Sequence, residues 1–177
     1  MTEAIHTLTI AQIGVGNWGR ALLRNFSSLE GVRVKSLCDK NPEMLKRVRS
    51  EHPHAAFTTS AEEVLMDNEI EAVVIAAPST EHSWLTKSAL DAGKHVFVEK
   101  PMALTSKAAR EVVGLASQRK KIIMVVEKLE ELRQIMAYKG GPIIMVGGKA
   151  ASLPEPDVYF EDVYPPDALA CAVYGSV

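Results

Sequence analysis

Three glycines near the start of the chain have the spacing of a turn that can hold phosphate groups. Gly14, Gly16 and Gly19 follow a short apolar run and form the pattern G-x-G-x-x-G. The first glycine allows a sharp turn out of a strand, the second lets a pyrophosphate approach the backbone closely, and the third lets a helix pack tightly on the strand. The phosphates would then face the N-terminal N–H groups of that helix, where Asn17 and Trp18 lie. The pattern favours a dinucleotide site, and a glycine-rich turn in another kind of α/β protein is the alternative.

An acidic residue stands where the second apolar run ends. Asp39 follows Gly19 by twenty residues, and a carboxylate at this place accepts hydrogen bonds from both hydroxyls of an adenosine ribose. It would also repel a 2′-phosphate, whereas the neighbouring Lys40 offers a cation that could tolerate one. A solvated turn residue is the alternative interpretation of Asp39. The sequence therefore predicts NAD as the preferred cofactor, with NADP as a second possibility.

Two further segments follow apolar runs, at the strand ends where open α/β sheets bind ligands. In the first, Ala77 and Pro78 would let a cofactor lie against the strand end, and His82 would either contact it or cap a surface helix. In the second, Glu99 and Lys100 are expected to contact the cofactor, and a lysine near a nicotinamide could polarise or protonate a substrate oxygen during hydride transfer. An exposed lysine with a solvated ammonium group is the alternative.

The elements that must position these residues alternate between strands and helices. Apolar runs predict strands over residues 8–13, 32–38, 55–57, 72–78, 95–98 and 121–126. Amphipathic spacing, with Ser60 and Thr105 as caps, predicts helices over 17–28, 41–50, 60–66, 81–91 and 105–120. The side chains of Trp18 and Trp84 are expected to pack on helix faces, and base-stacking platforms are the alternative. Such alternation implies right-handed βαβ crossovers, so we expect an α/β Rossmann fold, a doubly wound parallel sheet.

The last third of the chain has a different pattern. We expect one more amphipathic helix over residues 127–139 and a strand over 143–146. From Gly147 onward the glycines, prolines and acidic residues show no period, which predicts an irregular, partly mobile tail. The predicted organisation is therefore a dinucleotide-binding domain over 1–126 and a short appendage over 127–177.

Composition excludes several classes of partner. The net charge of −2 provides no bulk attraction to nucleic acid or to an anionic membrane. The first residues lack a basic segment followed by an apolar one, and no run approaches the roughly 18 apolar residues that span a bilayer. Cys38 and Cys171 have no metal-binding spacing, so no metal is expected. We expect a cytoplasmic protein that binds neither nucleic acid nor membrane.

Residues 8–126 resemble the nucleotide-binding half of the Gfo/Idh/MocA oxidoreductases, a family of sugar and inositol dehydrogenases and their relatives. The resemblance rests on the glycine pattern, Asp39, Pro78-x-x-x-His82, residues 92–96 and Glu99-Lys100-Pro101. It implies hydride transfer between NAD(P) and a polyol or sugar-like alcohol. It also implies that Lys100 is the catalytic, substrate-contacting lysine and that Pro101 is the adjacent, often cis, proline.

The chain also departs from the family pattern. Family enzymes carry a second α/β domain that forms the substrate floor and often the oligomer interface, whereas here only residues 127–177 follow. No histidine follows His95, so the family's acid/base histidine has no counterpart. We therefore expect firm dinucleotide binding with weak or absent turnover. Two alternative functions remain. The chain is then either a non-catalytic dinucleotide sensor or a truncated dehydrogenase fragment that is stabilised as a homo-oligomer.

Overall fold

The structure, a computed structural model, describes residues 7–125, 143–146 and 149–152. The helices are α1 (Asn17–Ser27), α2 (Pro42–Val48), α3 (Ala61–Met66), α4 (Ser79–Asp91) and α5 (Ser106–Arg119). The strands are β1 (Leu8–Ile13), β2 (Val32–Cys38), β3 (Ala56–Thr58), β4 (Ala72–Ile75), β5 (His95–Val98), β6 (Ile123–Met124), β7 (Ile143–Val146) and β8 (Lys149–Ser152). The expected alternation of strands and helices is confirmed from β1 to β6.

The first six strands form one parallel sheet in the order β3-β2-β1-β4-β5-β6. This is the order of a doubly wound Rossmann sheet, so the predicted fold class is confirmed. β1 pairs on one side with β2 and on the other with β4. The order of the chain reverses at β1 and β4, and the carboxyl ends of the strands at such a reversal are where doubly wound sheets bind ligands.

The chain divides into two compact units, Met1–Ala77 and Pro78–Val177. In the first unit, β1 is buried along nearly its whole length, as a strand covered on both faces requires. Side chains from the turn after β1, from β2, from α1 and from α2 form one apolar cluster beside it. The cluster consists of Val15, Leu23, Leu37, Leu45 and Val48. It holds the residues that follow β1 and β2 in fixed places.

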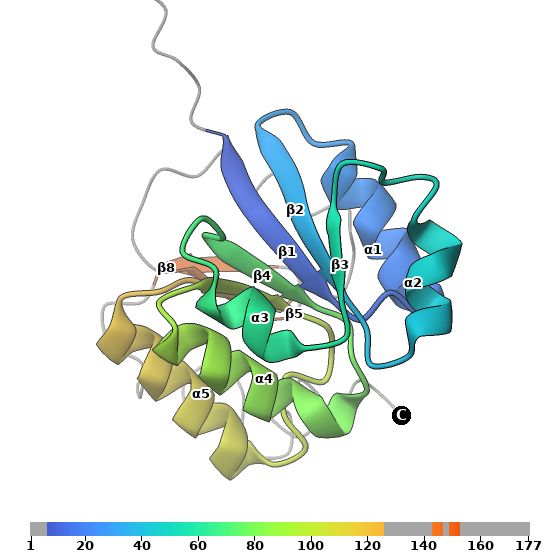
Figure 1. Cartoon of the computed structure of the whole chain (residues 1–177). Coiled ribbons are helices and arrows are strands. Elements are labelled where there is room, and N and C mark those ends of the chain that lie inside the picture. Colours follow the sequence, from blue (N-terminus) through green and yellow to red (C-terminus); the bar gives the residue numbers. More distant parts are fainter. Residues whose placement is uncertain (1–6, 126–142, 147–148, 153–177) are drawn as a thin grey trace, which may run out of the picture. The chain divides into compact units, whose positions relative to one another are not determined.

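In the second unit, α4 and α5 lie side by side (Figure 1). Their apolar faces are fully buried at Leu85, Leu90 and Val112. Exposed ion pairs, Lys87 with Glu111 at 3.2 Å and Arg119 with Asp91 at 2.8 Å, connect the two helices at the surface. Pairs of this kind contribute little to stability, so apolar burial accounts for most of the packing free energy.

Three helices begin where capping residues predict. The side-chain oxygens of Asn41, Ser60 and Thr105 accept the N–H groups of Glu43, Glu63 and Ala108 at 3.0, 3.4 and 3.1 Å. Each bond satisfies one of the N–H groups that the first turn of a helix leaves without an intrahelical partner. The predicted caps at Ser60 and Thr105 are confirmed.

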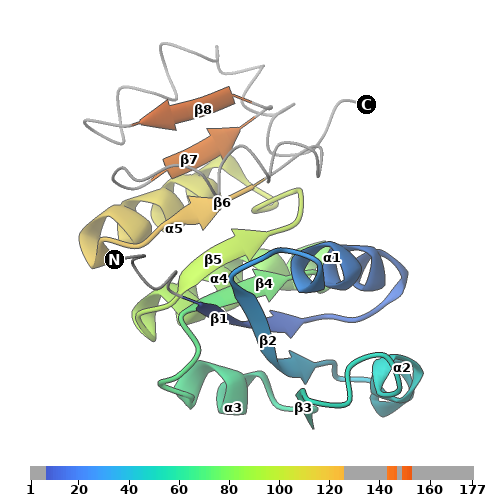
Figure 2. The same cartoon turned by 90° about the horizontal axis from the view of Figure 1, so that it is seen from above.

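One correction concerns the expected irregular tail. The strand expected over 143–146 is present as β7, but Lys149–Ser152 forms a second strand, β8, antiparallel to it, with Val146 opposite Lys149 (Figure 2). The prediction was wrong here because the sequence of β8 has no β-branched or aromatic residue that would indicate a strand. The helix expected over 127–139 and the rest of the tail lie outside the described residues.

A second correction concerns the two tryptophans. Trp18 and Trp84 are 58% and 55% exposed, so neither side chain packs into a helix interface as expected.

The start of one helix also differs from the prediction. The helix expected over 81–91, α4, begins at Ser79, because Pro78 with φ −57° and ψ 142° occupies its N-cap position. Across the described ranges, no helix has the length and apolar character needed to cross a membrane.

Candidate functional site

The turn after β1 is shaped by a backbone that only glycine adopts easily. Gly14 has a φ of +94°, and a Cβ at this position would collide with the carbonyl group of Ala76. The N–H of Gly14 donates to the carbonyl of Cys38 at 2.7 Å, and the N–H of Ala76 donates to the carbonyl of Ile13 at 2.8 Å. The turn is therefore tied to both neighbouring strands.

The other two glycines have opposite surroundings. A Cβ on Gly19 would collide with the carbonyl oxygen of Gly14, so the first turn of α1 can approach the glycine turn only without a side chain here. A Cβ on Gly16, in contrast, would have no atom of the described residues within 4 Å. The space in front of Gly16 is open, and a side chain there would fill it.

The N-terminus of α1 has the features of an anion-binding site. Its N-cap residue, Gly16, makes no side-chain capping bond, and its first turn contains no acidic residue. Asn17 and Trp18 are exposed, and Asn17 accepts a bond from Arg20 at 3.2 Å through Oδ1. The positive end of the helix dipole and its N–H groups consequently face the open space at Gly16, an arrangement that suits a phosphate group.

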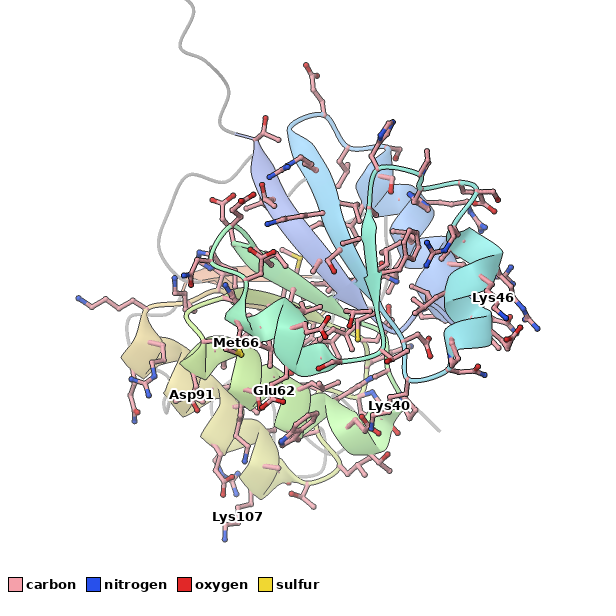
Figure 3. All side chains as sticks on the ribbon, in the orientation of Figure 1. Lys40, Lys46, Glu62, Met66, Asp91 and Lys107 are labelled. Carbon is pink, nitrogen blue, oxygen red and sulfur yellow. The ribbon has the colours of Figure 1, made fainter. Side chains whose placement is uncertain are left out.

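Asp39 is held by the backbone on both of its carboxylate oxygens. Oδ2 accepts the N–H of Val15 at 2.9 Å, and Oδ1 accepts the N–H of Asn41 at 2.9 Å. Because each carboxylate oxygen has two lone pairs, both can still accept a hydroxyl group. The half-buried carboxylate thus has a fixed orientation next to the glycine turn, while Lys40 beside it is exposed (Figure 3).

Cys38 does not contribute nucleophilic chemistry to this region. Burial, followed by the negative charge of Asp39, raises the pKa of its thiol to about 11. The thiol therefore stays protonated near neutral pH, and the thiolate is the reactive form. Within the described part of the chain, no group of three or more His, Cys, Asp or Glu side chains could hold a metal ion.

Sequence reasoning missed Gln12. This side chain in β1 is fully buried, and its Nε2 donates to the carbonyl of Gly14 at 2.8 Å and to that of Gly19 at 2.7 Å. The available signal was a single amide residue in a mostly apolar strand that ends directly before the first glycine. Buried amides need partners, and backbone carbonyls of a tight turn supply them.

The second unit contains four further predicted residues, Pro78, His82, Glu99 and Lys100. His82 lies in the first turn of α4, is 2% exposed, and its Nδ1 is 2.8 Å from the carbonyl oxygen of Pro101. A surface-capping role for His82 is therefore wrong. Since a carbonyl only accepts, Nδ1 carries the proton. The bond between Lys100 and Pro101 is cis, as the resemblance implies, and Lys100 is exposed while Glu99 is buried.

The structure thus gathers the predicted residues into two groups. Gly14, Gly16, Gly19 and Asp39 surround one turn in the first unit. In the second unit, Pro78 and His82 belong to the start of α4, and Glu99 and Lys100 follow β5. Ala77 is the last residue of the first unit.

Comparison with known proteins decides the family. The model of GFO_IDH_MocA, described as an oxidoreductase family with an NAD-binding Rossmann fold, matches residues 8–127, which is more than half of the chain. The chain belongs to this family. Residues 8–127 are accordingly an NAD-binding Rossmann domain, and the open space at Gly16, the uncapped helix and Asp39 fit that cofactor.

Three relatives illustrate the similarity. A glycosyl hydrolase family 109 protein of Shewanella baltica is 32% identical over 157 residues, with 81% of this chain and 34% of that protein covered. The alpha-N-acetylgalactosaminidase of Shewanella oneidensis is 30% identical over 139 residues, with 73% and 30% covered. The crystal structure of apo scyllo-inositol dehydrogenase from Lactobacillus casei has a TM-score of 0.65 and 25% identity, with 70% and 37% covered. The chain spans about a third of the length of the curated relatives it matches.

Proposed function

We propose that this chain binds NAD with the pyrophosphate at Gly16 and the adenosine ribose at Asp39, as the cofactor-holding part of an oxidoreductase. The observation that supports this most directly is the open space in front of Gly16, beside a helix N-terminus that has no cap. Asp39 lies one hydrogen bond away from the same turn, through the N–H of Val15. A dinucleotide presents an anionic pyrophosphate and a diol at the corresponding ends of its adenosine half.

The proposed substrate is a polyol or a sugar-like alcohol. Two of the relatives have names that refer to such compounds, scyllo-inositol in one and an N-acetylgalactosamine glycoside in the other. Bound NAD would supply a hydride acceptor for the alcohol carbon. By resemblance, Lys100 holds or moves the proton of the alcohol oxygen at its Nζ, and its side chain is exposed.

His82 has a positioning role in this proposal. Its Nδ1–H donates to the carbonyl of Pro101, the residue that follows Lys100. Because the imidazole is buried, this bond is partly shielded from water and helps to hold the Pro101 peptide in place. The backbone that carries Lys100 is thereby fixed, although the lysine side chain itself is exposed.

Calorimetric titration of the chain with NAD and NADP tests the cofactor assignment. We expect saturable binding of NAD and weaker binding of NADP, because the Asp39 carboxylate would face the 2′-phosphate. No heat of binding with either dinucleotide at about millimolar concentration, well above the range of ordinary cofactor sites, would contradict the proposal.

Replacing Asp39 by alanine is expected to weaken NAD binding at least about tenfold. The change removes the ribose acceptors, and hydrogen bonds to a charged group contribute about 1.5–3 kcal/mol each. It also leaves the N–H groups of Val15 and Asn41 without their acceptor. Titration of the variant gives the affinity. The matched control is Asp91→Ala, which removes an exposed carboxylate in the second unit and should bind NAD like the wild type. Equal affinities of Asp39→Ala and wild type would refute the ribose assignment.

Replacing Lys100 by alanine is expected to abolish NAD-dependent oxidation of polyols while changing NAD affinity by less than about threefold. Loss of a general acid–base group lowers turnover by about 10²–10⁴-fold. Formation of NADH with scyllo-inositol and N-acetylgalactosamine as trial substrates is the measurement. The control is Lys107→Ala, which removes an exposed lysine of α5 and should leave both NAD affinity and polyol oxidation unchanged. Any turnover of the wild type is expected to be weak, and turnover that survives unchanged in Lys100→Ala would rule out this role.

A further inference from the structure

Trp18 carries a large apolar side chain that the first unit leaves exposed. It is the second residue of α1 and is 58% exposed, whereas Leu22 and Leu23, one turn later, are fully buried. A single exposed apolar side chain is ordinary on a protein surface, so exposure alone does not make a site. The place of Trp18 on the helix decides what its indole can contact.

Along the helix axis, the side chain of Trp18 extends toward the open space at Gly16. The Cα–Cβ bonds of an α-helix are tilted toward its N-terminus, so a side chain covers the surface of the turn before its own Cα. For the second residue of α1 that surface lies at the start of the helix, where Gly16 is the N-cap residue. The indole therefore lies at the edge of the space that we assign to the pyrophosphate.

Around the helix axis, Trp18 is separated from the adenosine side of the turn. Successive residues of an α-helix are rotated by about 100°, so Trp18 lies about 140° from Leu23 and about 40° from Leu22. Leu23 belongs to the apolar cluster that also contains Leu37 of β2 and two side chains of α2. Trp18 consequently lies on the flank of α1 that is turned away from β2.

The order of the strands shows which end of a dinucleotide reaches this flank. β1 lies between β2 and β4, so the side of the turn away from β2 is the side of β4. Asp39, which we assign to the adenosine ribose, follows β2, and a dinucleotide lies across the reversal of strand order in a doubly wound sheet. With the pyrophosphate at Gly16, the nicotinamide half extends toward the end of β4 and passes Trp18.

We propose that the indole of Trp18 stacks against the nicotinamide ring of the bound cofactor, so that this residue selects the complete dinucleotide over its adenosine half. The inference rests on the proposed function, because it starts from the pyrophosphate at Gly16 and the ribose at Asp39. Stacking on an aromatic side chain needs only a π-face, which nicotinamide offers. The ring of NAD also carries a positive charge, and the face of an indole attracts cations.

Binding of NAD, ADP-ribose and ADP tests the proposal, because ADP-ribose lacks only the nicotinamide. We expect Trp18→Ala to weaken NAD binding at least about fivefold, as loss of one aromatic stack does, and binding of the other two ligands less than about twofold. Trp18→Phe keeps a π-face and should lose less NAD affinity than Trp18→Ala. The matched control is Trp84→Ala, which removes a similarly exposed indole from the second unit and should bind all three ligands like the wild type. Calorimetric titration gives the affinities.

Tryptophan fluorescence provides a second readout, because the chain contains two tryptophans. Trp84→Phe leaves Trp18 as the indole that emits, and Trp18→Phe leaves Trp84. We expect NAD to quench the emission of Trp84→Phe more strongly than ADP-ribose does, since contact with the electron-poor nicotinamide ring quenches an excited indole. The emission of Trp18→Phe should respond equally to the two ligands.

The outcomes separate this inference from the proposed function. If the wild type binds none of the three ligands, the cofactor assignment fails and the inference fails with it. If the wild type binds NAD, but Trp18→Ala weakens NAD and ADP-ribose equally or weakens neither, only the role of Trp18 is overturned. Replacing an exposed side chain changes stability little, and thermal unfolding of Trp18→Ala checks this. If that variant does not fold, the fluorescence of Trp84→Phe decides, and equal quenching by NAD and ADP-ribose would overturn the proposal.

Discussion

Gly16→Ala is expected to leave the fold intact and to weaken NAD binding at least about tenfold. The backbone at Gly16, with φ −62° and ψ −167°, is open to any residue, and the added Cβ meets no atom of the described residues within 4 Å. Alanine is a poorer N-cap than glycine, but it also restricts the unfolded chain by about 0.4–1 kcal/mol, so the two effects nearly cancel. The methyl group instead fills the space that the pyrophosphate needs, and a tenfold loss corresponds to about 1.4 kcal/mol.

The measurement combines titration with NAD and thermal unfolding of the same sample. Gly114→Ala is the matched control, because a Cβ there also has nothing within 4 Å. It lies inside α5, where alanine is preferred by about 0.5–1 kcal/mol, so this variant should become slightly more stable and bind NAD normally. If Gly16→Ala binds NAD as tightly as Gly114→Ala, the pyrophosphate does not lie against Gly16.

Gly14→Ala is expected to lower the free energy of unfolding by about 2–5 kcal/mol. A φ of +94° is strained for alanine by about 1–2 kcal/mol. The Cβ would also meet the backbone that follows β4, including the amide nitrogen of Ala77 at 2.8 Å, and overpacking of this kind costs about 1–3 kcal/mol. Since domains are stable by only about 5–15 kcal/mol, a large part of the stability would be lost. Urea denaturation gives the value.

Gly93→Ala separates the two contributions to this loss. Gly93 also has a positive φ, +74°, but a Cβ there would lie 4.0 Å from the nearest atom, Cε of Lys121. Only backbone strain remains, so this variant should lose about 1–2 kcal/mol. Similar losses for Gly14→Ala and Gly93→Ala would mean that β4 can move away, and that contact with Ala76 does not define the turn.

The sheet could be predicted from the sequence because each of its strands corresponds to a local apolar run. The run before Pro78 is apolar throughout, as a strand buried on both faces must be, and apolar residues predominate in the run before Gly14 and in the run ending at Cys38. Their ends are marked by glycine, proline or a charged residue. The sequence of β8, Lys149–Ser152, has no such signal. This segment is a strand because it pairs with β7. Pairing between strands is a property of two segments, and a pattern read along one segment does not contain it.

The candidate site was less predictable, because its decisive contacts are tertiary. That both oxygens of Asp39 accept backbone N–H groups depends on where Val15 and Asn41 lie in space. The contact between His82 and Pro101 joins α4 to the segment after β5, and the two bonds of Gln12 cross the turn. Trp18 shows the reverse error: its large apolar side chain predicts packing, yet its place at the exposed start of α1 leaves it 58% exposed.

The glycine turn also bears on the order of folding. Its shape depends on three bonds to other segments, from Gly14 to Cys38, from Val15 to Asp39 and from Ala76 to Ile13. The first two bonds form only where β1 lies beside β2, and the third only where β1 lies beside β4. Non-local pairings of this kind form slowly because a long loop must close first. A peptide that carries only the glycine pattern lacks them. Affinity for the cofactor therefore arises with the completed first unit, and a bound dinucleotide would draw the folding equilibrium toward that unit by mass action.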